Sequence, residues 1–235
     1  MDTAPFTLEI TQDAPAVFHA PSCSGSLDLR LGDCMEGMKD FPDGHFDLAI
    51  VDPPYGIGNF IPQTGKRTAG NFGAVAWNDA PPPPEYFAEL RRVSKNQIIW
   101  GANYYNCFTG AAIIWDKRQL NPKLSRCEIA SVSIGDRVAY VEIPWAGFIG
   151  TAERSGIHPC EKPVSLYKWT LDNYAKPWMK VLDTHMGSGS IAIAAHYAGI
   201  HLTAYEIDAD YFHAAKARIA RETSQAELFS PQNNQ

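Results

Sequence analysis

The feature that most constrains the fold is a strand–turn–helix–strand pattern over residues 181–207. An apolar strand begins at Val181, a glycine-rich turn follows at 183–189, a helix over 190–198 ends at Gly199, and a second strand occupies 201–207. Two strands joined through a helix form a βαβ unit, whose strands lie parallel and are covered by helices. The pattern therefore predicts an α/β fold.

The turn in this unit has the composition of a ligand site. Gly187 and Gly189 let the backbone approach a ligand closely, and the following helix offers free N–H groups. Glu206 lies 206 − 187 = 19 residues after the first glycine, where a carboxylate can accept hydrogen bonds from both hydroxyls of a ribose. Asp183, where the strand ends and the turn begins, can face a cationic or amino group of the ligand. These residues predict a nucleoside-like cofactor, but Gly187-x-Gly189-x-x-Ala192 also fits the dinucleotide fingerprint.

Strand-like and helix-like runs alternate through the rest of the chain. We expect strands at 46–51, 97–100, 112–115, 129–134 and 138–143. We expect further helices after the prolines at 81–84, at 163–174 and at 209–221. The prediction is a single domain over 27–223, with a loose lead-in at 1–26 and a disordered tail at 224–235. The tryptophans expected in its core are Trp100, Trp115, Trp145, Trp169 and Trp178.

A second motif, Asp52-Pro53-Pro54-Tyr55, directly follows the apolar strand at 46–51. In an open α/β sheet, ligands bind where such strands end. An aromatic amine is a poor nucleophile because its lone pair is delocalised into the ring, and acceptors for its N–H groups favour the attacking, pyramidal form. Asp52 and the carbonyl of Pro53 can be those acceptors, held in place by proline rigidity. Tyr55 can stack on a base that has left its helix.

Composition sets limits on partners and compartment. The net charge is −6, which by itself argues against DNA binding, although basic residues cluster at 117–126 and at 66–67. The five cysteines are scattered and form no CxxC, so neither a disulfide framework nor a metal site is expected. No apolar stretch reaches the roughly 20 residues of a membrane helix, and no secretory signal is recognisable. We therefore expect a reduced, cytoplasmic protein that does not interact with membranes.

Together these segments resemble the amino-directed DNA methyltransferases, in particular the small adenine methyltransferases of phages and bacteria. Residues 52–55 match the catalytic motif of that family, and residues 182–190 resemble its cofactor loop. Residues 158–163, His-Pro-Cys-Glu-Lys-Pro, resemble its His-Pro-Thr-Gln-Lys-Pro segment, and residues 32–34 resemble a segment near the cofactor's adenine. Further phage-type likeness lies at 96–104 and 114–118, so the resemblance runs from about Leu27 to Ile219.

The resemblance implies a Rossmann-like fold, a mostly parallel sheet with helices on both faces, and S-adenosylmethionine as cofactor. The catalytic residues are then Asp52, Pro53, Pro54 and Tyr55. The cofactor-binding residues are Asp33, Cys34, His158, Lys162, Asp183, Thr184, Met186, Gly187, Ser188, Gly189, Glu206 and Ile207. The chain departs from the family pattern at Cys160 and Glu161, where Thr and Gln are usual, and at His185-Met186, where Pro-Phe is more common.

The order of the motifs predicts which segments face DNA. The catalytic motif precedes the cofactor loop by 183 − 52 = 131 residues, which the family calls the β arrangement. In that arrangement the target-recognition segment lies between the motifs, at about 116–157, and a mobile loop at about 56–75 closes over the flipped base. The DNA-binding residues expected there are Lys66, Arg67, Lys117, Arg118, Lys123 and Arg126. Members of the β arrangement are often dimers, so a homodimer is one expectation. The other is a short DNA recognition sequence that is read with relaxed specificity.

Asp rather than Ser at position 52 resembles the adenine-directed members, so we expect methylation of the 6-amino group of adenine in double-stranded DNA. The sequence leaves four alternatives open. They are an N4-cytosine or RNA methyltransferase, a protein amide methyltransferase (for which Asn at 52 is typical), a nicotinamide-dependent oxidoreductase that uses the glycine turn, and a non-catalytic DNA-binding module.

Overall fold

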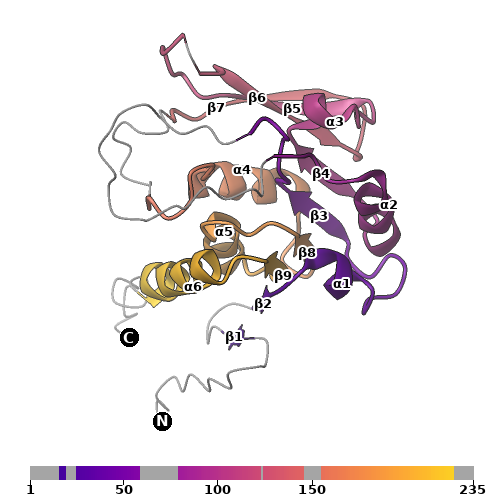
Figure 1. Cartoon of the computed structure of the whole chain (residues 1–235), viewed down its shortest axis with the longest axis vertical. Helices are drawn as coiled ribbons and strands as arrows, with labels where there is room; N and C mark the ends of the chain where they lie inside the picture. The colour runs from indigo at the N-terminus through magenta and orange to yellow at the C-terminus, as the bar shows by residue number, and fades with distance from the viewer. Residues whose placement is uncertain (1–15, 20–24, 59–78, 123, 146–154, 225–235) are drawn as a thin grey trace, which may run out of the picture.

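The computed structural model describes residues 16–19, 25–58, 79–122, 124–145 and 155–224 (Figure 1). Its strands are β1 (Ala16–His19), β2 (Ser26–Leu31), β3 (Leu48–Val51), β4 (Gln97–Trp100), β5 (Ala111–Asp116), β6 (Cys127–Val132), β7 (Val138–Glu142), β8 (Lys180–Asp183) and β9 (His201–Glu206). Its helices are α1 (Cys34–Met38), α2 (Pro84–Val93), α3 (Ala102–Tyr105), α4 (Val164–Tyr174), α5 (Ser190–Ala198) and α6 (Ala209–Ser224).

The strands form one sheet in the order β1-β2-β9-β8-β3-β4-β6-β5-β7. Of the eight neighbouring pairs among the described strands, five are parallel and three antiparallel. Helices α4, α5 and α6 lie on one side of the sheet, and α1 and α2 lie on the other (Figure 1). The expected Rossmann-like architecture, a mostly parallel sheet covered on both faces, is confirmed.

The core follows the alternation of side chains along the central strands. In β3, Leu48 and Ile50 join the cluster beneath α4, α5 and α6, whereas Ala49 and Val51 join the cluster beneath α1 and α2. All four residues are buried, as expected for a strand covered by helices on both faces. The short apolar run therefore becomes a central strand because both of its faces are apolar.

The predicted elements agree with the structure, with boundaries that shift by a few residues at most. Three elements, β2, α1 and α3, were not predicted, and β1 lies within the segment expected to be a loose lead-in. The expectation of a buried Trp178 is wrong, because its side chain is 67% exposed, whereas Trp100, Trp115 and Trp145 are buried. Most of the loop 56–75 and the tail after Ser224 lie outside the described residues. No described helix combines the length and apolar composition that a membrane crossing requires.

The topology reverses between β3 and β8, and this reversal fixes the place of a site. These strands are parallel neighbours, with Leu48 opposite Val181 and Ala49 opposite Leu182. The chain leaves β3 toward α2 on one face and leaves β8 toward α5 on the other. Such a switch point opens a crevice outside the carboxyl ends of the strands, where open α/β sheets bind ligands.

The core assignment predicts a position-dependent cost of removing a leucine side chain. Leu202, in β9, is 1% exposed and packs in the larger core cluster. Leu202→Ala should lower the free energy of unfolding by about 2–5 kcal/mol, because it removes buried methyl groups and leaves a cavity. Leu120→Ala is the matched control, since Leu120 is 92% exposed, and should stay within about 0.5 kcal/mol. Urea unfolding followed by circular dichroism measures both, and equal losses would contradict the assignment.

Candidate active site

A cavity of about 850 Å³ opens at the carboxyl ends of β3 and β8. Its lining includes Asp52 and Tyr55 of the first motif and Gly187, Glu206 and Ile207 of the second. The parallel pairing of β3 with β8 brings the two motifs together although they are far apart in the sequence. This size is within the range of small-molecule sites, and the cavity joins the two motifs in one space.

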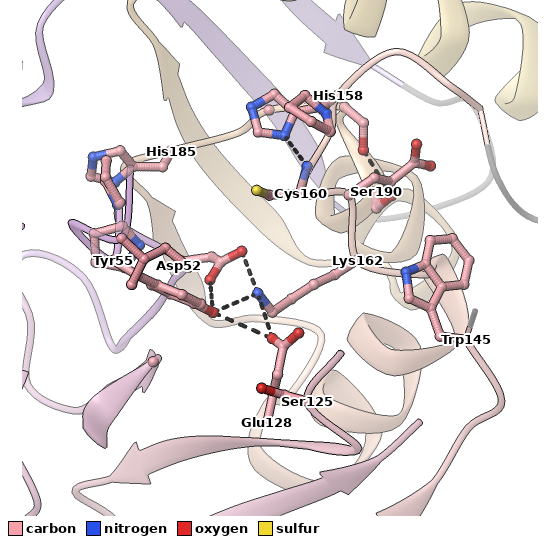
Figure 2. Close-up of a pocket in the computed structure, with 18 of the residues that line it drawn as sticks. Asp52, Tyr55, Ser125, Glu128, Trp145, His158, Cys160, Lys162, His185 and Ser190 are labelled. Atoms are coloured by element: carbon pink, nitrogen blue, oxygen red, sulfur yellow. Dashed lines mark hydrogen bonds and ion pairs between the residues drawn. The ribbon is translucent and has the colours of Figure 1, made fainter. Parts of the chain in front are cut away.

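Four polar side chains meet at the Asp52 end of the cavity (Figure 2). The Tyr55 hydroxyl donates to Asp52 Oδ1 at 2.7 Å, and the Lys162 ammonium pairs with Asp52 Oδ2. Lys162 Nζ also donates to the Tyr55 hydroxyl at 3.1 Å and pairs with Glu128 Oε2 at 3.2 Å. The catalytic motif is therefore part of a hydrogen-bonded network of two carboxylates, an ammonium and a phenol.

The charges in this network determine its protonation. Burial raises the pKa of Asp52, and the nearby Glu128 raises it further, while Lys162 opposes both. Burial alone would raise the pKa of Glu128, but the ammonium groups of Lys162 and Lys117 outweigh it and hold that pKa at about 2. Burial lowers the pKa of Lys162, and the two carboxylates more than compensate, so Lys162 stays protonated. An ammonium thus stands directly against the Asp52 carboxylate.

The prolines of the motif present their carbonyls to a tyrosine. The Tyr105 hydroxyl, at the end of α3, has two carbonyl acceptors for its one hydrogen, Pro53 O at 2.5 Å and Pro54 O at 2.9 Å, and the shorter distance favours Pro53. Tyr104 stacks on the Tyr55 ring with a centroid distance of 4.8 Å. Gly101 permits this arrangement, because it has φ 73° and an added Cβ would lie 2.3 Å from the Tyr55 ring. Helix α3 therefore holds both the carbonyls and the aromatic ring of the motif in place.

At the glycine turn, the Glu206 carboxylate accepts two hydrogen bonds from the backbone. Its Oε2 accepts from the Gly187 N–H at 2.8 Å and its Oε1 accepts from the Asp208 N–H at 3.0 Å, while burial raises its pKa. Asp183 is 2% exposed and accepts from the His185 N–H at 3.0 Å. Burial raises the pKa of Asp183 to about 8. The turn thus combines two acceptor carboxyls with backbone held close to the cavity.

A buried ion pair supports the turn from behind. Arg218 of α6 is 1% exposed and donates to Glu161 Oε1 at 2.9 Å. The same guanidinium nitrogen donates to Ser188 O at 3.2 Å and to Ser190 Oγ at 3.0 Å. Glu161 also accepts from the Ser155 hydroxyl at 2.7 Å. Glu161, one of the departures from the family pattern, thus joins the segment 158–163 to the glycine turn through Arg218.

The structure brings most of the predicted site residues to the cavity. Those that line it are Asp52, Pro53, Pro54, Tyr55, Lys117, His158, Lys162, Met186, Gly187, Ser188, Glu206 and Ile207. Asp183, Thr184 and Gly189 lie behind this lining in the same strand and turn. Asp33 caps α1 by accepting from the Met35 N–H at 2.8 Å, and Cys34 begins that helix. Gly32 donates its N–H to Glu206 O at 2.8 Å, so the end of β2 lies beside Glu206.

The expected DNA-binding residues divide into three groups. Lys66, Arg67 and Lys123 lie outside the described residues. Arg118 and Arg126 have side chains 53% and 62% exposed and pair with Glu142 and Asp116. Lys117, by contrast, has a side chain only 13% exposed and pairs with Glu128 at 3.0 Å. Lys117 and Lys162 therefore both supply charge to the Asp52 end of the cavity.

Sequence reasoning missed Glu128, Tyr105, Tyr86 and Arg218. Tyr86 of α2 is buried and shares a hydrogen bond of 2.6 Å with the Thr184 hydroxyl. Glu128 and Tyr105 lie in no recognised motif, and only the fold brings them to residues 52–55. For Arg218 a weak signal existed, because a cation on the apolar face of a predicted helix needs a buried partner.

The sequence of this chain matches a known protein family. The family N6_N4_Mtase, described as DNA methylase, matches residues 99–217, about half of the chain. The chain belongs to this DNA methylase family. Its enzymes are S-adenosylmethionine-dependent N6/N4 DNA methyltransferases, so the nicotinamide-dependent oxidoreductase is excluded.

Individual relatives agree with the family assignment. "Putative methylase YubD" of Escherichia coli (strain K12) is 27% identical over 203 residues, which cover 80% of this chain and 88% of the relative. The PvuII DNA methyltransferase (cytosine-N4-specific) has a TM-score of 0.56 at 10% identity, covering 87% of this chain and 93% of its own. The M1.HpyAVI–SAM complex has a TM-score of 0.52 at 19% identity, covering 82% of this chain and 99% of its own. At these identities the two structures support the fold.

The buried ion pair behind the turn predicts a large cost of removing its arginine. Arg218→Met should lower the free energy of unfolding by about 3–5 kcal/mol, because it leaves the Glu161 carboxylate buried without its cation. Arg221→Met is the matched control, since the Arg221 side chain is 60% exposed and lies 3.5 Å from Glu222, and it should change stability by less than about 0.5 kcal/mol. Urea titrations of both variants test this, and a small loss for Arg218→Met would show that Glu161 does not depend on it.

Proposed function

We propose that this DNA methylase transfers a methyl group from S-adenosylmethionine to the 6-amino group of a flipped-out adenine in double-stranded DNA. The observation that carries the proposal is that Asp52, at the end of β3, lines the same cavity as the glycine turn and Glu206. One space thus contains acceptors for an amino group and a cradle for a nucleoside-like methyl donor. The residues 27–223 form the catalytic domain in this proposal.

The residues of the turn fit the methyl donor. Glu206 faces the cavity with a carboxylate that two backbone N–H groups hold in place, which leaves lone pairs for ribose hydroxyls. Ile207 is 66% exposed at the cavity and offers an apolar surface for an adenine ring. When bound, S-adenosylmethionine supplies a methyl group on a positively charged sulfonium. The chain's remaining task is to align the base with that methyl group.

Asp52 and Pro53 supply the alignment and the polarisation of the amine. The two N–H groups of the amine donate to the Asp52 carboxylate and the Pro53 carbonyl, which favours the pyramidal form with an available lone pair. Both acceptors are already fixed by Lys162, Tyr55 and Tyr105 before the base arrives. Preorganised acceptors need no rearrangement as the N–CH3 bond would form, the S–CH3 bond would break to leave a neutral thioether, and positive charge develops on the attacking nitrogen. The nitrogen would then lose one proton along its hydrogen bond to the Asp52 carboxylate, which gives the neutral methylated amine.

The choice of adenine rests on position 52. Asp there resembles the adenine-directed members, whereas Ser is more frequent in cytosine-directed members. The segment 116–157, which begins at the end of β5 and includes the exposed Arg118 and Arg126, would face the DNA. A homodimer stays a prediction, which sedimentation of the protein at micromolar concentration would test.

The direct test is transfer of label from S-adenosylmethionine to unmethylated plasmid DNA, followed by separation of the nucleosides. Wild type should place the label on 6-methyladenine. Asp52→Ala should lose at least about 100-fold in rate, because it removes a preorganised acceptor. Asp172→Ala, at an exposed position on α4, is the matched control and should keep the wild-type rate.

Each other result has a defined meaning. Label on 4-methylcytosine would overturn the base assignment and keep the chemistry at Asp52. Label only on RNA or on protein would overturn the assignment of DNA as the substrate. Bound cofactor with no transfer to any of the three would favour a DNA-binding module without catalysis.

The contact of Tyr105 with the proline carbonyls predicts a smaller effect. Tyr105→Phe keeps the ring and removes the hydroxyl that fixes Pro53 O, so kcat should fall roughly five-fold. Tyr174→Phe, the same change on α4 away from the cavity, should leave kcat unchanged. Steady-state kinetics on plasmid DNA measures both, and a wild-type kcat for Tyr105→Phe would mean that the prolines hold the carbonyl without help.

A further inference from the structure

Glu128 is a charged residue that no motif accounts for. It is the second residue of β6, with a side chain 23% exposed in the wall of the cavity. Its Oε1 accepts from Lys117 at 3.0 Å, and its Oε2 lies 3.2 Å from Lys162 Nζ and 3.3 Å from the Tyr55 hydroxyl. Lys117, Glu128, Lys162 and Asp52 thus form a chain of alternating charge that ends on the catalytic carboxylate. Figure 2 shows the part of this chain from Glu128 through Lys162 to Asp52.

We propose that Glu128 is a positioning residue that releases Asp52 for the substrate's amino group, by taking over the Tyr55 hydrogen bond and by sharing the Lys162 ammonium. The proposal rests on the proposed function, since it assigns Glu128 a part in binding the amine. It adds to the four-residue motif a carboxylate from strand β6.

The Tyr55 hydroxyl can exchange one carboxylate acceptor for another. A phenol has one hydrogen to donate, and two carboxylate oxygens compete for it, Asp52 Oδ1 at 2.7 Å and Glu128 Oε2 at 3.3 Å. The shorter distance assigns the hydrogen to Asp52 while the site holds no base. When an amino group donates to Asp52 Oδ1, the phenol can turn its hydrogen to Glu128. Asp52 then exchanges one donor for another, and the buried hydroxyl keeps an acceptor.

The buried Lys162 ammonium is shared between two carboxylates. Its side chain is 4% exposed, so its ammonium needs counter-charges within the protein. With Glu128 present, two carboxylates share that ammonium. Without the charge of Glu128, Asp52 would be its sole carboxylate partner among the described residues and would be held more strongly by Lys162. A carboxylate bound in that way is a poorer acceptor for the N–H of an amine.

Several groups face these side chains and enter any titration of the site. From α3 comes Tyr105, from β8 comes Asp183, and from the segment 158–163 come Cys160 and Lys162. Among the described residues, the groups coupled electrostatically to Asp52 or Glu128 include Tyr55, Tyr86, Tyr105, Lys117, Cys160, Lys162, Tyr167 and Asp183. The cations in this set are Lys162 and Lys117. Removing the charge of Glu128 or of Lys162 should therefore shift the pKa of Asp52 in a predictable direction.

The two charges next to Asp52 act in opposite directions. Glu128 raises the pKa of Asp52, and Lys162 lowers it. Glu128→Gln should therefore move the acid limb of the kcat–pH profile to lower pH, whereas Lys162→Met should move it to higher pH. A side chain that merely filled space would not give opposite shifts.

The experiment measures kcat, KM and the acid limb for wild type, Glu128→Gln and Lys162→Met on a plasmid that wild type methylates. Glu128→Gln is isosteric and should lower kcat about ten-fold with unchanged affinity for S-adenosylmethionine. Glu128→Asp keeps the charge but its shorter side chain reaches less far toward Tyr55. Its kcat should therefore fall, while the acid limb of its kcat–pH profile should stay at the wild-type pH.

Glu85→Gln, an exposed position on α2, is the matched control and should have wild-type kinetics. Wild-type kcat in Glu128→Gln, or an acid limb that moves in the same direction as in Lys162→Met, would overturn the proposal.

A second readout separates this proposal from the proposed function. Carbon-13 spectra of carboxyl-labelled protein without DNA give the titration of Asp52, with Asp52→Asn to assign its signal. Opposite shifts of the Asp52 titration in Glu128→Gln and Lys162→Met would support the network even if wild type methylated no DNA, in which case only the proposed function would fail. An Asp52 titration that neither variant moves would overturn the role of Glu128 even if wild type methylated adenine.

Discussion

Parallel pairing between β3 and β8 is the constraint on which the site depends. The register sets Ala49 beside Leu182, so the chain segments that follow the two strands emerge side by side. One segment carries Asp52 and the prolines, and the other carries the glycine turn. Asp52 and Gly187, which are 187 − 52 = 135 positions apart, thereby face one cavity. A shift of register would separate the acceptors of the amine from the residues expected to bind the methyl donor.

Burial of charge is the second determinant of the site. Lys162, Asp52 and Glu128 would each be unfavourable alone in the wall of the cavity, and together they satisfy one another. Behind the turn, Arg218 and Glu161 do the same. In both networks the segment 158–163 supplies one member, Lys162 toward the catalytic motif and Glu161 toward α6. This short segment therefore ties the two halves of the site together.

The sequence predicted the elements that carry local signals. Strand β4 and helix α5 begin and end where expected, because an apolar run and a glycine stop define them without reference to the rest of the fold. The antiparallel pairing of β6 between β4 and β5 carries no such signal. The same distinction applies to the site, since Asp52 and Glu206 lie in motifs, whereas Glu128 and Tyr105 reach the site only through tertiary packing. Trp178 shows the opposite error, because an aromatic side chain was assigned to the core by residue type alone.

The central claim is that a flipped adenine lies in the cavity with its amino group between Asp52 and the Pro53 carbonyl. A crystal structure with an unreactive analogue of S-adenosylmethionine and a DNA duplex that contains the target site in unmethylated form tests it most directly. The account predicts the amino nitrogen at about 2.6–3.2 Å from both Asp52 Oδ1 and Pro53 O. It also predicts the Tyr55 hydroxyl turned toward Glu128. A target base held outside the cavity, or an amino group that contacts neither acceptor, would contradict the account.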